Sequence, residues 1–278
     1  MHQPGRNPTR RNRNIGTARQ GHGQDNRLVI PASWTDDRLF HEKLVSPVVV
    51  PISVANTSIS VLVEPPLSGF AHACTVDDIV QVMNMLPPRH IEAIKIIALR
   101  QPKRKEVILD ACWGRLQYWS EIAGHTGPAI HLEAQEVGRS LKWSKSLTPD
   151  RALELERLRS DGHSITSDKR QHVIALTIDS VRNTQLYRTI PHEVGHYVDY
   201  LSTVEEPSNG DYHRWLALNA KYDSRPHQEK EAFAHRYADN FREQQTGRGV
   251  LPFSRITNAE EMKQSGLDPD WFAAAKAD

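Results

Sequence analysis

The stretch IPHEVGHYVDYL, residues 190–201, constrains the fold more than any other part of this chain. On a helical wheel of about 100° per residue, His192 and His196 fall on one side. The apolar residues fall on the opposite side, between about 160° and 240° from His192. They are Ile190, Val194, Val198 and Leu201. The pattern therefore predicts a helix that packs on the core through one side and presents two imidazoles on the other.

Pro191 lies inside this stretch, one residue before His192. Proline lacks the N–H of an interior helical residue, and its ring clashes with the carbonyl four residues earlier. Two arrangements remain open. Either the helix begins near Thr189 with Pro191 in its first turn, or a longer helix bends at Pro191.

The two histidines and the residue after the first form the pattern H-E-x-x-H, with Glu193 directly following His192. Imidazoles four residues apart on a helix are neighbours, so one zinc ion can bind both. Glu193 falls at about 100° on the wheel, beside the pair, where its carboxylate can act on a water without binding the ion. A random chain of this composition contains such a match in about 4% of cases, so the pattern needs support from the rest of the chain.

A zinc ion that acts in catalysis takes three protein ligands and keeps one position for water. The segment HQEKEAFAHRYADNF, residues 227–241, predicts a second amphipathic helix that can supply the third ligand. Glu231 lies at the edge of the apolar side of this helix, whereas Glu229 falls on the outer side. We therefore expect Glu231 to be the third ligand, with Glu229 and His235 as alternatives.

HEVGHYVDYL followed by EAFAHRYA resembles the HExxH…Glu zinc metallopeptidases, or gluzincins. The sequences of these two motifs are most similar to those in the catalytic domain of anthrax lethal factor and related bacterial toxin-type peptidases. The resemblance covers residues 86–241 in layout and is specific in the two motifs. It implies a Zn²⁺ ion held by His192, His196 and Glu231, with Glu193 as the general base.

The same resemblance bears on three further positions. In this family a tyrosine upstream of the third ligand often assists catalysis, and Tyr222 is the nearest upstream candidate, with His227 as a rival. The family often has an acidic residue one turn after the ligand, where this chain has His235. Asp199 is expected either to orient one of the ligating histidines, or to be an acceptor for an N–H group or a surface charge.

The resemblance implies an α+β, zincin-like fold, in which a small mixed sheet packs on the active-site helix and the C-terminal half is mostly helical. The residues themselves agree with a mixed order of elements. Residues 46–66 are rich in β-branched side chains and predict one or two strands. AIHLEA, residues 129–134, alternates like a strand, and we expect it to be the edge strand that binds an extended peptide. Residues 172–178 fit either a buried strand or the start of a helix.

Three segments differ in character along the chain. Residues 1–27 contain six arginines and one acidic residue and predict a disordered basic tail. Residues 28–85 predict an N-terminal β-rich and helical extension packed on the catalytic domain. Residues 86–278 predict the zincin-like metallopeptidase domain. The tail lacks the apolar core of a secretory signal peptide, so we expect a protein that is cytoplasmic when made, and export by a signal-peptide-independent route stays open.

Charge and cysteine content exclude some partners. The formal net charge is +1, which gives no overall field to recruit nucleic acid. No apolar run is long enough for a membrane span. Cys74 and Cys112 do not form a pair of the C-x-x-C type, and we expect both to be buried and reduced.

The function expected from these features is zinc-dependent endopeptidase activity on a protein or peptide bound as an extended strand. The resemblance suggests a bacterial effector or toxin, with a cognate immunity or chaperone protein as partner. Two alternatives remain: an intracellular regulatory protease that cleaves one repressor or signalling protein, and a non-catalytic, zinc-stabilised binding module. The intact Glu193 argues against the last, because a purely structural site needs no base.

Overall fold

The computed structural model describes residues 39–103, 106 and 112–273. Contacts divide the chain into two compact units, Met1–Phe40 and His41–Asp278. The second unit contains all the strands and α-helices discussed below, and the short turn at Phe40–Glu42 spans the boundary.

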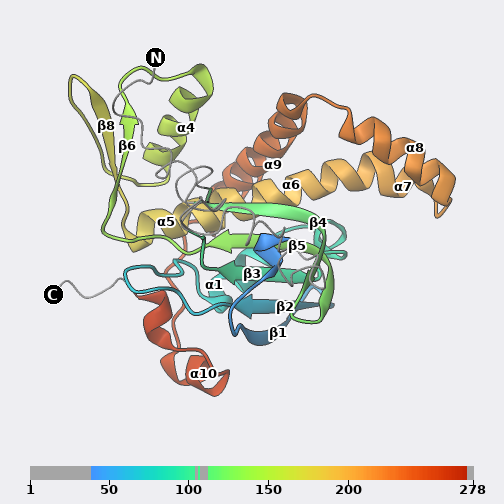
Figure 1. The fold of residues 1–278 in the computed structure, drawn as a ribbon, viewed down its shortest axis with the longest axis horizontal. Helices are drawn as coiled ribbons and strands as arrows, with labels where there is room; N and C mark the ends of the chain where they lie inside the picture. Colours follow the sequence, from blue (N-terminus) through green and yellow to red (C-terminus); the bar gives the residue numbers. More distant parts are fainter. Residues whose placement is uncertain (1–38, 104–105, 107–111, 274–278) are drawn as a thin grey trace, which may run out of the picture. The chain divides into compact units, whose positions relative to one another are not determined.

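The second unit has an α+β fold with two sheets (Figure 1). The larger sheet has the strand order β1-β2-β3-β5-β4, and the smaller has the order β6-β8-β7. Strand β3 runs parallel to β2 and β5, while the outer pairs β1–β2 and β5–β4 are antiparallel, so the larger sheet is mixed. The strands are β1 Val48–Val54, β2 Thr57–Val63, β3 Ile96–Arg100, β4 Gly114–Ile122, β5 His125–Glu133, β6 Ser140–Ser144, β7 Ile165–Ser167 and β8 Gln171–Ala175.

From Ile178 onward, every described element is helical, as the sequence predicts for the C-terminal half. The helices before this point are α1 Val76–Met83, α2 Pro88–Ile91 and α4 Pro149–Ser160, with a short 3₁₀ turn η4 at Phe40–Glu42. The later ones are α5 Ile178–Thr184, η5 Gln185–Thr189, α6 Ile190–Tyr200, η6 Leu201–Glu205, α7 Glu206–Ser208, α8 Tyr212–Asp223, α9 His227–Gly247, α10 Ala259–Gln264 and η7 Pro269–Phe272.

Helices α1 and α6 contribute to the main core against one face of the larger sheet. The strand pleat divides β3 between two clusters: Ile97 and Leu99 join the core shared with α6, while Ile96 and Ala98 join a smaller cluster on the opposite face. Ile190 and Val194 of α6 are fully buried in the main core. The apolar side predicted for this helix is therefore the side that packs.

Pro191 lies within a continuous helical segment that begins with α5, so the longer-helix alternative is the one adopted. The preceding turn, η5, is a π-helix, and Ile190 donates its N–H to the carbonyl of Gln185, five residues back. A π turn is wider than an α turn, and it gives the proline ring the room that a regular turn denies it. The imidazole-bearing helix is thus anchored at its N-terminal end by α5.

The prediction that residues 129–134 form the edge strand is wrong. Residues 129–133 belong to β5, which lies between β3 and β4, and β4 is the edge strand on this side of the sheet. The burial pattern gives the reason: Ala129 through Glu133 are buried on both faces, as expected for an internal strand. The ambiguous residues around His172 form strand β8.

The domain boundary expected between residues 85 and 86 falls inside the second unit, between α1 and α2. Strands β1 and β2, from the expected extension, pair into the same sheet as β3 and β5. The predicted tail, residues 1–27, lies outside the described residues.

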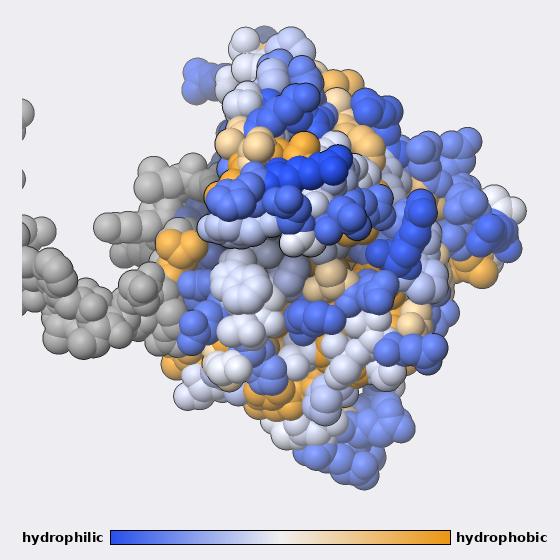
Figure 2. Space-filling view, turned by 90° about the vertical axis from the view of Figure 1, so that its right-hand side faces the viewer, coloured by the Kyte–Doolittle hydropathy of each residue, from blue (hydrophilic) through white to orange (hydrophobic). Residues whose placement is uncertain are grey.

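The face drawn in Figure 2 is mostly hydrophilic, and its hydrophobic residues form separate patches. Among the helices of the described residues, none is long and apolar enough to cross a membrane.

Candidate active site

Helices α6 and α9 make a close contact at Gly195. A Cβ atom added to Gly195 would lie 2.9 Å from Cβ of Tyr237 and 3.1 Å from Cα of Ala234. Real Cβ atoms do not approach other atoms this closely, so only glycine permits this spacing between the two helices. The close approach brings Glu231, which precedes Ala234 by about one turn on α9, next to the histidines of α6.

The three predicted ligands converge. The Nε2 atoms of His192 and His196 are 3.1 Å apart, and the two oxygens of Glu231 lie 3.4 Å and 3.3 Å from them. Ligand atoms on one tetrahedral zinc ion, at zinc–ligand distances of about 2.0–2.1 Å, are about 3.3 Å from one another. The spacing of the two imidazole nitrogens and the carboxylate oxygens therefore fits ligands of a single ion.

The charges around this cluster favour an ionised carboxylate. Burial acts to raise the pKa of Glu231, but hydrogen bonds from His192 and His196 outweigh it and hold that pKa far below its usual range. Burial acts to lower the pKa of His196, yet Glu231 and then Glu193 raise it above the ordinary value. A bound metal ion would replace the proton that these groups share, because metals and protons compete for the same lone pairs.

Glu193 is held between α6 and the edge strand. Its side chain is 7% exposed, and its Oε2 accepts a hydrogen bond of 2.8 Å from the backbone N–H of Leu116 in β4. Burial raises the pKa of Glu193, partly offset by the neighbouring His192 and His196. A carboxylate with a raised pKa that lies beside the ligand cluster has the properties of a general base.

His235 gives a second, overlapping ligand set. Ligand atoms of His192, Glu231 and His235 all lie within 4.8 Å of one another. However, Nε2 of His235 also accepts a hydrogen bond from Nη1 of Arg157, at 3.3 Å. Burial, and then the charges of His192 and Arg157, lower the pKa of His235 to about 3. Because the arginine occupies this lone pair and repels a second cation, the geometry favours His196 over His235 as the second nitrogen ligand beside His192.

The remaining alternatives on α9 lie at the edge of the cluster or outside it. Glu229 is 61% exposed and lies 3.8 Å from Arg225, as expected for its outer position on the helix. His227 is 82% exposed, and its Nε2 lies 3.5 Å from Oε1 of Glu231.

Tyr222 lies in a cluster of tyrosine side chains. Its hydroxyl lies 2.9 Å from the hydroxyl of Tyr118, and its side chain is buried among the rings of Tyr118 and Tyr200. Asp199 accepts two hydrogen bonds from Arg225, at 2.9 Å and 3.1 Å. It therefore serves as the acceptor for an arginine, and the expected link from Asp199 to a ligating histidine is absent among these contacts.

Two residues that contact this cluster, Leu116 and Arg157, were not identified from the sequence. Leu116 acts through its backbone, which no side-chain pattern can reveal. Arg157 comes from α4, and only the tertiary fold brings it to His235. The sequence of α4 carries no information about which residues of other elements its outer side chains contact.

The cluster opens into a cavity of about 580 Å³. Its walls come from the start of β4, from α4 and β6, and from α6 and α9. The lining residues with ionisable groups are Cys112, Asp150, Arg151, Glu154, Arg188, His192, Glu193, Glu231 and His235, and the aromatic ones are Trp113 and Trp143. A comparison with protein-family models, curated proteins and solved structures finds no match to this chain.

Proposed function

We propose that this protein is a zinc-dependent endopeptidase of the gluzincin type, with a zincin-like arrangement of its sheet and helices. The observation that carries the proposal is the convergence of His192, His196 and Glu231, whose ligand atoms lie 3.1–3.4 Å apart. Glu193 is fixed beside them by the backbone of β4.

The donor atoms fit zinc. Two imidazole nitrogens and one carboxylate oxygen form a His₂Glu set, which is a ligand set of catalytic zinc sites. A zinc ion held there supplies a water of lowered pKa and polarises the carbonyl of the scissile peptide bond.

Glu193 performs the proton transfers. In this proposal its carboxylate takes a proton from the attacking water and then donates it to the nitrogen of the leaving amine. The raised pKa of Glu193 supports the first step, because it makes the carboxylate a stronger base toward the attacking water. The hydrogen bond from Leu116 keeps the carboxylate from rotating away.

Strand β4 is the proposed binding site for the substrate backbone. The N–H of Leu116 points away from β5, because it meets Glu193, and the backbone of Gly114 faces the same side by the two-residue period of a strand. An extended peptide can therefore pair with β4 next to the candidate zinc site. This position replaces the one expected for residues 129–134.

The resemblance to toxin-type peptidases supports an effector or toxin role, with export by a route that needs no signal peptide and with a cognate immunity or chaperone protein. Export and partner both belong to the proposal and rest on that resemblance.

Glu193→Gln tests the function directly. Since the amide keeps the shape of the carboxylate but cannot accept the proton, we expect turnover to fall by about 10²–10⁴-fold while zinc content stays at the wild-type value. The measurements are cleavage of a peptide library, with and without a chelator, and metal analysis of the purified protein. Glu229→Gln, an exposed glutamate on α9, is the matched control and should cleave normally. Wild-type protein that binds zinc but cleaves no peptide would refute the peptidase and leave a binding module.

Tyr222→Phe tests the oxyanion donor. If Tyr222 turns from Tyr118 to the substrate carbonyl during catalysis, removing its hydroxyl should lower kcat by about 10²-fold or more, with little change in KM. Tyr118→Phe removes the other hydroxyl of the pair and serves as the comparison. Equal, small effects of the two variants would show that Tyr222 has only a packing role.

A further inference from the structure

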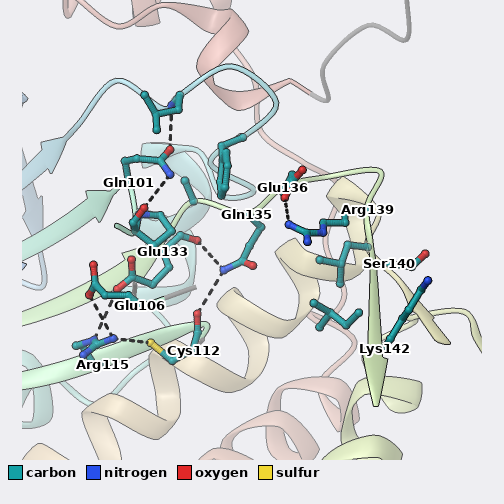
Figure 3. Close-up of a pocket in the computed structure, with 16 residues that line it drawn as sticks. Gln101, Glu106, Cys112, Arg115, Glu133, Gln135, Glu136, Arg139, Ser140 and Lys142 are labelled. Carbon is teal, nitrogen blue, oxygen red and sulfur yellow. Dashed lines mark hydrogen bonds and ion pairs between the residues drawn. The ribbon is translucent and has the colours of Figure 1, made fainter. Parts of the chain in front are cut away.

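A second cavity, of about 950 Å³, adjoins the candidate active site. Figure 3 shows the residues that line it. The two cavities share Cys112, Gln135 and Leu141 in their walls. The second cavity is lined by charges of both signs: Arg115, Arg139 and Lys142, and Glu106, Glu133 and Glu136. Its volume is in the range of pockets that hold small molecules, and its mixed charges favour a ligand with both ammonium and carboxylate groups.

Cys112 stands where the two cavities meet. Its Sγ accepts a hydrogen bond from Nη2 of Arg115, at 3.1 Å, as Figure 3 shows. A guanidinium beside the sulfur favours the thiolate, which is the nucleophilic form of cysteine. Cys112 is also only partly buried, so the expectation of two buried thiols is wrong at this position.

Cys74, the other cysteine of the chain, provides an internal contrast. It is fully buried, and burial raises the pKa of its thiol far above the ordinary value. The two thiols of one chain should therefore differ sharply in reactivity.

Glu133 gives an independent indication of a ligand in the second cavity. Its side chain is 3% exposed, and its Oε2 has no hydrogen-bond partner among the described residues. Burial raises the pKa of Glu133 to about 7, although Arg100 and Arg115 act in the opposite direction. A buried carboxylate oxygen without a partner is costly, and a ligand that brings a hydrogen-bond donor would remove this cost.

We propose that Cys112 is a thiol–disulfide exchange site for small zwitterionic disulfides, and that the adduct fills the second cavity and obstructs the active site. The thiolate of Cys112 attacks one sulfur of the disulfide, a new S–S bond forms to Cys112, and the original S–S bond breaks. The other half leaves as a thiolate and takes a proton from water, so the small disulfide is the oxidant. The blocking of cleavage rests on the proposed peptidase function, whereas the exchange at Cys112 stands on its own.

The exchange is tested by intact-mass spectrometry of the folded full chain after incubation with oxidised glutathione, a disulfide that carries both charges. The expected result is one glutathionyl group on the wild-type protein and on Cys74→Ala, and none on Cys112→Ser. We expect Cys112 to react at least about tenfold faster than Cys74, because exchange follows exposure and thiolate content. No adduct on Cys112, or preferential reaction of Cys74, would overturn the proposal.

The role of the cavity is tested with a second reagent and a second variant. Lys142→Glu adds a negative charge to the cavity wall and should slow the reaction with oxidised glutathione, while the reaction with the uncharged hydroxyethyl disulfide keeps its rate. Equal slowing of both reagents, or of neither, would mean that the cavity charges do not select the ligand.

The regulatory part is tested by peptide cleavage. The wild-type adduct should lose cleavage and regain it when dithiothreitol removes the glutathionyl group, with zinc content unchanged throughout. Cleavage by Cys112→Ser should not respond to the disulfide. Full cleavage by the adduct would refute obstruction, whereas an adduct on a wild-type protein that never cleaves would refute the peptidase and leave the exchange site intact.

Discussion

Four imidazoles lie within 3.9 Å of the carboxylate of Glu231, yet a zinc ion with an open position needs only two of them. Those of His192 and His196 have the spacing of ligands on one ion, while that of His235 is engaged by Arg157. Because more imidazoles lie near Glu231 than one ion needs, substitutions can identify which of them bind it.

Substitutions at the cluster should separate the ligands from their neighbours. We expect His196→Asn and Glu231→Ala to abolish stoichiometric zinc binding, because each removes one of three ligands. His235→Asn should weaken zinc by no more than the about 10–100-fold typical of residues that only support a ligand. Competition with a metal-sensitive dye measures these affinities. Loss of zinc from His235→Asn, with retention by His196→Asn, would show that the overlapping set holds the ion.

At the scale of single residues, the sequence predicts on which side of a helix each side chain lies, because helical periodicity determines it. The spacing of His192 and His196 and the inward side of α9 place Glu231 correctly beside them. Periodicity does not reveal which hydroxyl or guanidinium comes from another element, so the environment of Tyr222 and the contact of Arg157 could not be predicted.

At the scale of elements, the contact between α6 and α9 depends on Gly195. In Gly195→Ala, the higher helix propensity of alanine contributes about 1 kcal/mol of stability, but overpacking typically costs about 1–3 kcal/mol. We expect a net loss in the free energy of unfolding and weaker zinc binding, because the helices must separate and carry Glu231 away from the histidines. Gly247→Ala is the matched control, since a Cβ at this helical glycine of α9 meets nothing within 4 Å. A Gly195→Ala protein with wild-type zinc affinity would contradict this account.

The elements themselves were predicted unequally well. Capping boxes and apolar periodicity locate helices because both are local properties, and α1 begins with a capping box formed by Thr75 and Asp78. The order of strands within a sheet is not local. Residues 129–134 read as a strand from their own pattern, but only pairing with β3 and β4 on both sides makes β5 internal.

At the scale of the whole molecule, buried histidines should make the fold acid-sensitive. Burial lowers the pKa of His72 from 6.5 to about 4, although its Nε2–H donates to the carbonyl of Glu64 at 2.7 Å. Between these two pH values the unfolded chain binds a proton that the folded chain does not, so the free energy of unfolding falls as the pH drops from about 6.5 to about 4. The loss attributable to His72 is about 3 kcal/mol, from about 1.4 kcal/mol per pKa unit.

His72→Gln tests this dependence, because glutamine keeps an N–H donor for Glu64 but does not titrate. Urea unfolding at several pH values should give a shallower fall for His72→Gln than for the wild type. His213→Gln, at an exposed position on α8, should leave the slope unchanged. Parallel curves for the wild type and His72→Gln would rule out His72 as a source of acid sensitivity.

Composition alone could not predict the domain boundaries of the whole chain. The change in composition after residue 27 predicts a tail, but the boundary expected at residues 85 and 86 rests on the limits of the resemblance. Pairing of β2 with β3 crosses that boundary, and such long-range pairing leaves no local mark in the sequence.

The hairpin of α7 and α8 links the two helices that carry the proposed metal ligands. Its turn is formed by Asn209 and Gly210, both exposed and both with positive φ. Helices α6 and α9 are held together at Gly195 rather than by this connection. The turn is therefore a suitable site for inserting an additional sequence. A fluorescent protein or an affinity tag inserted between Asn209 and Gly210 should leave the positions of His192, His196 and Glu231 unchanged.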